Sequence, residues 1–166
     1  MRNKQKGFSL IELLIVVAII LIIAAIAIPN LLRARISANE ASAASSLRTM
    51  NTACITYNST YGVYPATQTV LGPANGATPT STLADLLDIV LAPASGAAVK
   101  SGYTITYATP GANVSASATA GQVYTITAIP VVENQTGIRT FFTEQDGVIR
   151  ADATGGTPTF SSTPLQ

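Results

Sequence analysis

The sequence predicts an α+β fold in which one long N-terminal helix packs on a four-stranded antiparallel sheet. An almost unbroken apolar run occupies residues 8–28, and apolar or small residues then recur at helical spacing as far as Tyr61. From Gly102 onward the pattern changes to a period of two, which is typical of strands with one buried face. With 166 residues, the chain is long enough for one modest domain and one extension.

The apolar run at residues 8–28 is interrupted only by Ser9 and Glu12. Its 21 residues would span about 31 Å as a helix, which matches the roughly 30 Å hydrocarbon core of a bilayer. Three basic residues and no acid precede the run: Arg2, Lys4 and Lys6. Because a basic flank stays in the cytoplasm, we expect a single membrane span with the N-terminus inside and the remainder outside.

Gly7 is the conspicuous small residue near this run, and it lies before the run instead of after it. A secretory signal has a shorter apolar region of about 7–15 residues with its cleavage site on the far side. Cleavage at Gly7 would leave the hydrophobic segment on the mature protein.

Glu12 is an acid inside the run, and a carboxylate at mid-bilayer costs about 2.5–3.5 kcal/mol. In one interpretation Glu12 reaches the headgroup layer, where the positive end of the helix dipole favours it. In the other, it pairs with a positive group inside the apolar environment. Membrane physics alone does not choose between them.

Residues 6–20, KGFSLIELLIVVAII, resemble the class III signal of type IV pilins and type II secretion pseudopilins. The match joins a basic leader, Gly7, an N-terminal Phe8, Glu12 at mature position five and an unbroken apolar helix. The resemblance is specific over about residues 1–60 and only architectural beyond. It implies that a prepilin peptidase cleaves between Gly7 and Phe8 and methylates the new amine of Phe8, and that Glu12 neutralises this amine on a neighbouring subunit.

The same resemblance implies a homo-oligomeric helical filament and a pilin fold. Its assembly would need an inner-membrane platform protein and a cytoplasmic ATPase. The precursor would lie in membrane lipid, in the bacterial inner membrane, and the filament at the cell surface or in the periplasm. Whether the filament is a pilus or a secretion pseudopilus stays open, because the chain has neither the Cys pair nor the Trp that would point to one of them.

Pro29 ends the apolar run at the membrane edge and predicts a kink there. The resemblance implies that residues 24–29 can unwind during packing. A stripe at steps of three, four and seven then continues the helix and should bury against the globular part of the chain, with small residues beside it facing neighbouring helices. The stripe consists of Leu32, Ile36, Ala43, Leu47, Met50, Cys54, Tyr57 and Tyr61. The position of Cys54 in it predicts a buried, inert thiol.

Residues 62–101 are rich in Gly, Pro, Ala, Ser and Thr and predict a long surface loop. Within it, residues 82–91 combine a start like a capping box with apolar residues at helical spacing, which predicts a short amphipathic helix.

Residues 102–151 predict the sheet, with a hairpin turn at Asp146-Gly147. The expected strands are Tyr103–Tyr107, Val123–Ile129, Ile138–Glu144 and Val148–Ala151. One face should cover the helical stripe: Tyr103, Ile105, Tyr107, Tyr124 and Ile126. The expected organisation is therefore a leader, a core helix, an amphipathic half-helix, a loop, the sheet and a tail, at residues 1–7, 8–29, 30–61, 62–101, 102–151 and 152–166.

Three acids, Glu144, Asp146 and Asp152, lie close together in sequence. No calcium loop of the D-x-D-x-D-G type is present, so a solvated hairpin is expected and not a metal site. Arg139 is expected to pair with one of these acids at the surface.

The composition excludes several classes of function. Nine basic against eight acidic residues give a net charge of +1, which offers no broad basic surface for nucleic acid. There is no histidine and a single cysteine, so the common general base and the common metal ligands are missing. No catalytic, cofactor-binding or metal-binding residue is expected, and we do not expect an enzyme.

Two alternatives to a pilus subunit remain: a type II secretion pseudopilin, and a monomeric membrane-anchored extracytoplasmic binding domain. A monomeric binding domain would not explain the Gly7-Phe8 pair or the off-centre position of Glu12.

Overall fold

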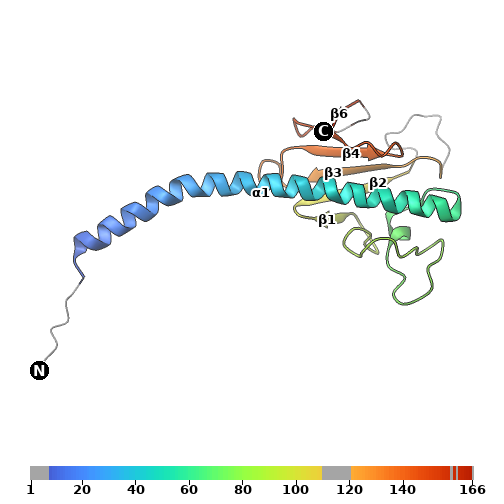
Figure 1. Ribbon diagram of the computed structural model, residues 1–166, viewed down its shortest axis with the longest axis horizontal. Coiled ribbons are helices and arrows are strands. Elements are labelled where there is room, and N and C mark those ends of the chain that lie inside the picture. The colour runs from blue at the N-terminus through green and yellow to red at the C-terminus, as the bar shows by residue number, and fades with distance from the viewer. Residues whose placement is uncertain (1–7, 110–120, 158, 160, 166) are drawn as a thin grey trace, which may run out of the picture. The chain divides into compact units, whose positions relative to one another are not determined.

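The computed structural model describes residues 8–109, 121–157, 159 and 161–165 (Figure 1). One long helix is followed by an antiparallel sheet, which confirms the predicted α+β fold. The chain divides after Arg35 into two compact units, and we call the second unit, which begins at Ile36, the head. The elements are α1 (Leu10–Tyr61), the 3-10 helix η1 (Gln68–Leu71), β1 (Ala98–Lys100), β2 (Tyr103–Ala108), β3 (Thr125–Pro130), β4 (Thr140–Glu144), β5 (Arg150–Asp152) and β6 (Thr163–Pro164).

The first unit presents its apolar side chains outward. Part of α1 is long and apolar enough to cross a membrane: an 18-residue window has a mean hydropathy of 3.3, and none of it is buried. The helix continues through Pro29, so the kink at this residue stays a prediction. Such a surface is stable only in lipid or against other apolar helices, because its exposure to water would be costly.

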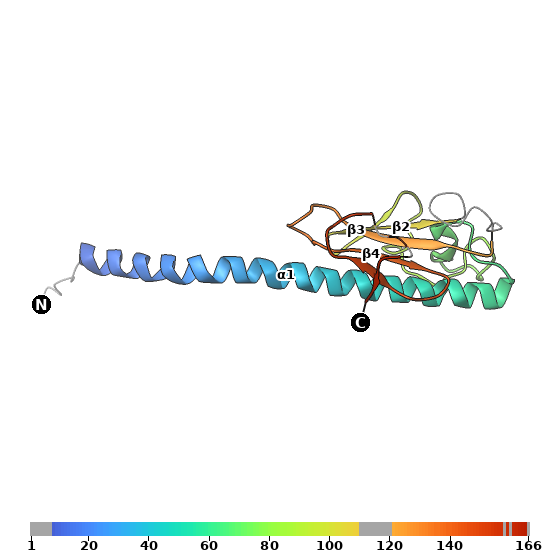
Figure 2. The same ribbon diagram turned by 90° about the horizontal axis from the view of Figure 1, so that it is seen from above.

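In the head, the C-terminal half of α1 lies along one face of the sheet, as Figures 1 and 2 both show. The predicted stripe is buried at six positions of the head, which confirms the helical spacing: Ile36, Ala43, Leu47, Met50, Cys54 and Tyr57. The sheet contributes Tyr103, Ile105, Tyr124 and Ile126, all fully buried, while Tyr107 is only partly buried. Cys54 has no exposed surface, and burial raises the pKa of its thiol to about 12.

The sheet has six strands where the sequence predicted four, in the order β1-β2-β3-β4-β5-β6, and every neighbouring pair is antiparallel. The four expected strands form as β2 to β5. The two additional strands are the edges, β1 with three residues and β6 with two. Strands this short do not show an alternation of apolar and polar residues in the sequence. They are extended because they pair with a neighbouring strand.

The short helix predicted at residues 82–91 is absent, and this prediction was wrong. The backbone N–H groups of residues 84–87 donate to carbonyls of residues 70–72, at 2.8–3.0 Å, instead of to carbonyls four residues back. Asp85 also has a φ of +55°, which a right-handed helix does not allow. Pairing of this segment with the η1 region therefore overrides its helical pattern.

The sequence predicted that Arg139 pairs with an acid near the hairpin, and this prediction was wrong. Arg139 pairs with Glu40 on α1. Its Nε lies 2.8 Å from Glu40 Oε2, and the backbone N–H groups of Ile138 and Arg139 both donate to Oε1 at 3.1 Å. Glu40 is only 6% exposed. Burial on its own raises the pKa of Glu40, but the two backbone donors and the guanidinium outweigh it and hold this pKa below its usual value.

A second buried polar contact joins α1 to the sheet. Asn51 Nδ2 donates to Thr143 Oγ1 at 2.8 Å, and the Tyr124 hydroxyl donates to Asn51 Oδ1 at 3.1 Å. Asn51 is 5% exposed and Thr143 is fully buried, so no water is at hand to replace either partner. The contact fixes how α1 sits on β4 and on Tyr124, the residue before β3, in the head.

We expect Asn51→Ala to lower the free energy of unfolding by about 1–3 kcal/mol, because it leaves buried hydroxyls of Tyr124 and Thr143 without this partner. Thermal unfolding followed by circular dichroism measures the loss. Thr52→Ala is the matched control, since the Thr52 hydroxyl is exposed and bonds only to Arg48 O of its own helix. Equal midpoints for the two variants would contradict the expectation.

Candidate functional site

The candidate site is the first turn of α1. The backbone N–H of Ser9 donates to Glu12 Oε2 at 3.0 Å, and Leu13 N donates to Ser9 O at 3.3 Å. Ser9 is thus the N-cap of α1, and Glu12 satisfies an N–H group that the helix itself cannot. The S-x-x-E spacing at residues 9–12 is the sequence signal for this cap, and our sequence analysis missed it.

The carboxylate of Glu12 keeps capacity for a second partner. Within the described part of the chain, its only hydrogen bond is the one to Ser9, which uses one of its two oxygens. An ionised carboxylate can accept several donors, and charged donors bind it most strongly. Glu12 can therefore bind a cationic group without giving up the helix cap.

An exposed apolar surface surrounds this carboxylate. Phe8 is 83% exposed and Leu10 79%, and the larger side chains that follow are exposed by about half or more. A shallow groove runs along one side of the helix, lined by Leu10, Leu13, Leu14, Val17, Ala18 and Leu21. A charge that finds its partner within such a surface is held far more strongly than in water.

Of the predicted site residues, Glu12 lies in this turn and Phe8 lies two residues before the helix begins, four residues from Glu12. Pro29 lies further along the same helix, inside α1. Gly7, the predicted cleavage position, lies outside the described residues, as does the basic leader at residues 1–7.

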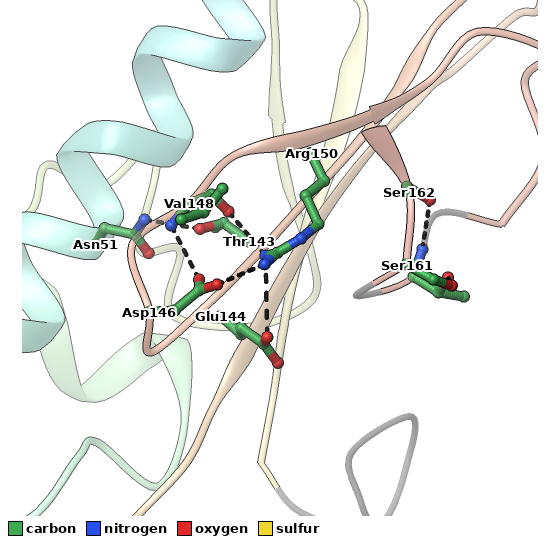
Figure 3. Close-up of polar contacts among 9 residues, drawn as sticks. Asn51, Thr143, Glu144, Asp146, Val148, Arg150, Ser161 and Ser162 are labelled. Carbon is green, nitrogen blue, oxygen red and sulfur yellow. Dashed lines mark hydrogen bonds and ion pairs between the residues drawn. The ribbon is translucent and has the colours of Figure 1, made fainter. Parts of the chain in front are cut away.

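Glu144, Asp146 and Asp152, which lie close together in sequence, do not form a second site. Figure 3 shows Arg150 directed toward Asp146 and Glu144, with its Nη2 at 2.6 Å from Asp146 Oδ2. Burial, followed by the charge of Asp146, raises the pKa of Glu144, which Arg150 opposes. Asp152 instead accepts hydrogen bonds from Thr154. In the described ranges no three His, Cys, Asp or Glu side chains are placed to hold a metal ion.

An exposed apolar half-helix suits a membrane-inserted or helix-packing segment. Residues 2–28 match the family model described as the prokaryotic N-terminal methylation motif. This match covers the whole of the candidate site, including the positions at which cleavage and methylation were predicted from the resemblance.

Two curated relatives are similar to part of this chain. The chain is 70% identical over 40 residues to the type IV wide pilus major component PilA4 of Thermus thermophilus, which is 24% of this chain and 30% of the relative. It is 48% identical over 50 residues to the type IV major pilin protein PilA of Myxococcus xanthus, which is 30% of this chain and 23% of the relative. The chain thus spans less than a third of the length of these relatives.

Proposed function

We propose that this chain is a structural subunit of a type IV pilus or pilus-like filament, without enzymatic activity. The observation that carries the proposal is the position of Glu12: one acid, four residues after Phe8, on a helix whose apolar side chains are exposed. The methylation motif at residues 2–28 and the two pilin relatives support it.

In this proposal the precursor is cleaved between Gly7 and Phe8. Hydrolysis of this peptide bond frees an amine on Phe8, and methylation of the amine leaves its positive charge in place. A prepilin peptidase performs both steps. The leader at residues 1–7 is lost, and the helix of residues 8–29 becomes the part that packs in the filament core.

Glu12 then binds the Phe8 amine of a neighbouring copy. In an apolar surrounding an unpaired charge is costly, so an incoming subunit is favoured at the axial position where the two charges meet. Before assembly the subunit lies in the inner membrane as a single-pass precursor, with its N-terminus inside and the head outside. A platform protein and a cytoplasmic ATPase would then move it into a filament at the cell surface.

The remaining parts follow from this arrangement. Residues 30–61 carry the head on the second half of α1, and Pro29 marks the change from apolar core to amphipathic helix.

Mass spectrometry of the mature N-terminus, combined with electron microscopy of sheared surface material, tests the proposal. We expect a chain that begins with N-methylated Phe8 and filaments that contain it. Recovery of the chain only as single molecules with residues 1–7 attached would refute it and favour the membrane-anchored monomer. Short periplasmic filaments that appear only with an active secretion system would favour the pseudopilin.

A further inference from the structure

The connection between η1 and β1 in the head contains an Asn-Gly pair, Asn75-Gly76. Asparagine is among the chemically labile residues of proteins. It loses its side-chain amide without an enzyme when the backbone nitrogen of the next residue attacks its side-chain carbonyl carbon. A following glycine favours this reaction, because glycine has no side chain to hinder the approach and leaves the backbone free to rotate. Glycine follows no other asparagine in this sequence.

Asn75 and Gly76 are the two central residues of an exposed turn. Ala77 N donates to Ala74 O at 3.0 Å, and φ is +50° at Asn75 and +86° at Gly76. Positive φ at both central positions defines a type I′ turn, for which Asn-Gly is a favoured sequence. Among the described residues, only the chain neighbours of Gly76 come within 4 Å of the place where a Cβ on Gly76 would lie. Water therefore reaches both reacting groups.

The backbone nitrogen of Gly76 has no competing partner. Within residues 8–109, 121–157, 159 and 161–165, neither this N–H nor the side-chain amide of Asn75 takes part in a hydrogen bond. The attack needs a rotation about ψ of Asn75, which the bond between Ala77 N and Ala74 O resists. An exposed turn that a single backbone hydrogen bond closes opens at low free energy, so the folded head reaches the reactive geometry.

Asn134 provides an internal comparison, because it is also exposed and has a φ of +61°. The next residue is Gln135, whose backbone N–H donates to Val132 O at 3.2 Å. The nitrogen that would attack Asn134 is therefore engaged, and a side chain crowds it. Inside α1 the next nitrogen belongs to the helix ladder, which protects four further asparagines: Asn30, Asn39, Asn51 and Asn58.

We propose that Asn75 is a site of spontaneous deamidation in the folded head. The Gly76 nitrogen forms a bond to Asn75 Cγ and gives up its proton. The bond between Cγ and Nδ2 breaks, and Nδ2 takes up a proton and leaves as ammonia. One water then opens the resulting cyclic imide at either carbonyl, which leaves a carboxylate at position 75 as aspartate or isoaspartate. Because no enzyme takes part, the modified fraction rises with the age of the subunit.

The new carboxylate arises in an unfavourable place. Ala74 N donates to Asp85 Oδ1 at 3.3 Å, so a second negative charge appears one residue away from a group that an acid already binds. Asn75 also borders an apolar pocket of about 190 Å³ with Ile89 in its wall. Isoaspartate in addition lengthens the main chain within the turn. We therefore expect the modified turn to be cut faster by an added protease than the unmodified turn.

The experiment compares Asn75 with Asn134 in the same molecule. The full chain, kept folded in detergent micelles, is incubated at neutral pH for increasing times, and each sample is digested at acid pH to stop the reaction. Mass spectrometry measures the fraction of each asparagine that has become an acid, against a sample digested at the start. Electron-transfer fragmentation distinguishes isoaspartate from aspartate. A parallel sample in guanidinium chloride gives the rates for the unfolded chain.

We expect conversion in the folded chain to be several-fold faster at Asn75 than at Asn134, and to give both isoaspartate and aspartate. Asn75→Gln should abolish conversion at position 75, because glutamine would have to close a larger ring. Conversion at Asn134 in this variant should stay as it is in the original chain. Circular dichroism verifies that the variant is folded.

Three results would overturn the inference: equal rates at Asn75 and Asn134 in the folded chain, conversion at Asn75 only in guanidinium chloride, or conversion to aspartate without isoaspartate. The second result would show that the turn protects Asn75. The third would show direct hydrolysis of the amide without attack by the Gly76 nitrogen. None of these results bears on filament assembly, so the proposed function is tested separately.

Discussion

Glu12→Ala is expected to abolish filaments while leaving the subunit inserted and cleaved. Breaking a buried ion pair costs about 3–5 kcal/mol, which corresponds to roughly 100-fold or more in the equilibrium for adding a subunit. Insertion should not suffer, because the substitution removes a carboxylate that the bilayer disfavours. Yield of sheared filaments, compared with the amount of cleaved subunit in the membrane fraction, measures the effect.

Glu12→Gln separates the charge from the helix cap. Glutamine keeps an oxygen that can accept the Ser9 N–H, as Glu12 Oε2 does at 3.0 Å, but it has no charge for the Phe8 amine of a neighbour. We expect Glu12→Gln to assemble as poorly as Glu12→Ala. Ser9→Ala, which alters neither the charge nor the backbone donor, should assemble normally. Normal filament yield in Glu12→Gln would show that the cap is what matters and would contradict the intersubunit pair.

Glu40→Ala is expected to destabilise the head by about 1–3 kcal/mol; the Arg139 guanidinium is 42% exposed, so water partly replaces its lost partner. The substitution also leaves two backbone N–H groups, those of Ile138 and Arg139, without the acceptor that holds them at 3.1 Å. Near-ultraviolet circular dichroism of the tyrosines during thermal unfolding, in detergent micelles, measures the loss. Glu133→Gln, at an exposed acid of the same β3–β4 connection, is the control.

The pH dependence gives this prediction a second readout. Because the pKa of Glu40 is lowered in the folded state, the unfolded chain takes up its proton first as the pH falls below the usual value of about 4.5. The stability that Glu40 contributes is thus complete above that pH and is lost as the pH drops through the folded-state pKa. Glu40→Gln should lack this part of the acid sensitivity. An unchanged acid profile in Glu40→Gln would contradict the assignment.

Much of the fold could be predicted from local pattern. The alternation of apolar and polar residues predicted β2 to β5, and the helical spacing predicted the side of α1 that packs on the sheet. Both patterns depend only on which side chains are buried along one element. The edge strands β1 and β6 could not be found in this way. They are extended only because a neighbouring strand supplies their hydrogen bonds, and neither is long enough to alternate.

The wrong prediction for the partner of Arg139 has a related cause, since its true partner is distant in sequence. The stripe on α1 steps by seven residues from Ile36 to Ala43, and Glu40 fills that gap at four and three residues from its neighbours. An acid at a buried helical position predicts a cation on the facing element, and this signal was present in the sequence. Nothing local identified Arg139, 99 residues further on, as that cation.

The spacing of Phe8 and Glu12 could be read from the sequence, because these residues lie four positions apart within one motif, and their roles stay predictions. What the structure adds is the hydrogen bond between Ser9 and Glu12. For the 82–91 segment, the regular apolar pattern predicted a helix that does not form. Its backbone N–H groups at residues 84–87 donate to carbonyls of residues 70–72 instead.

Complete enclosure of the lone cysteine gives the molecule a built-in reporter. Alkylating reagents attack the thiolate, and the Cys54 thiol is both shielded from solvent and, with its pKa of about 12, protonated at any physiological pH. Folded copies should therefore resist both iodoacetamide and oxidative crosslinking. The fraction of chains that take up the label in intact cells then counts those whose head has opened, and needs no engineered probe.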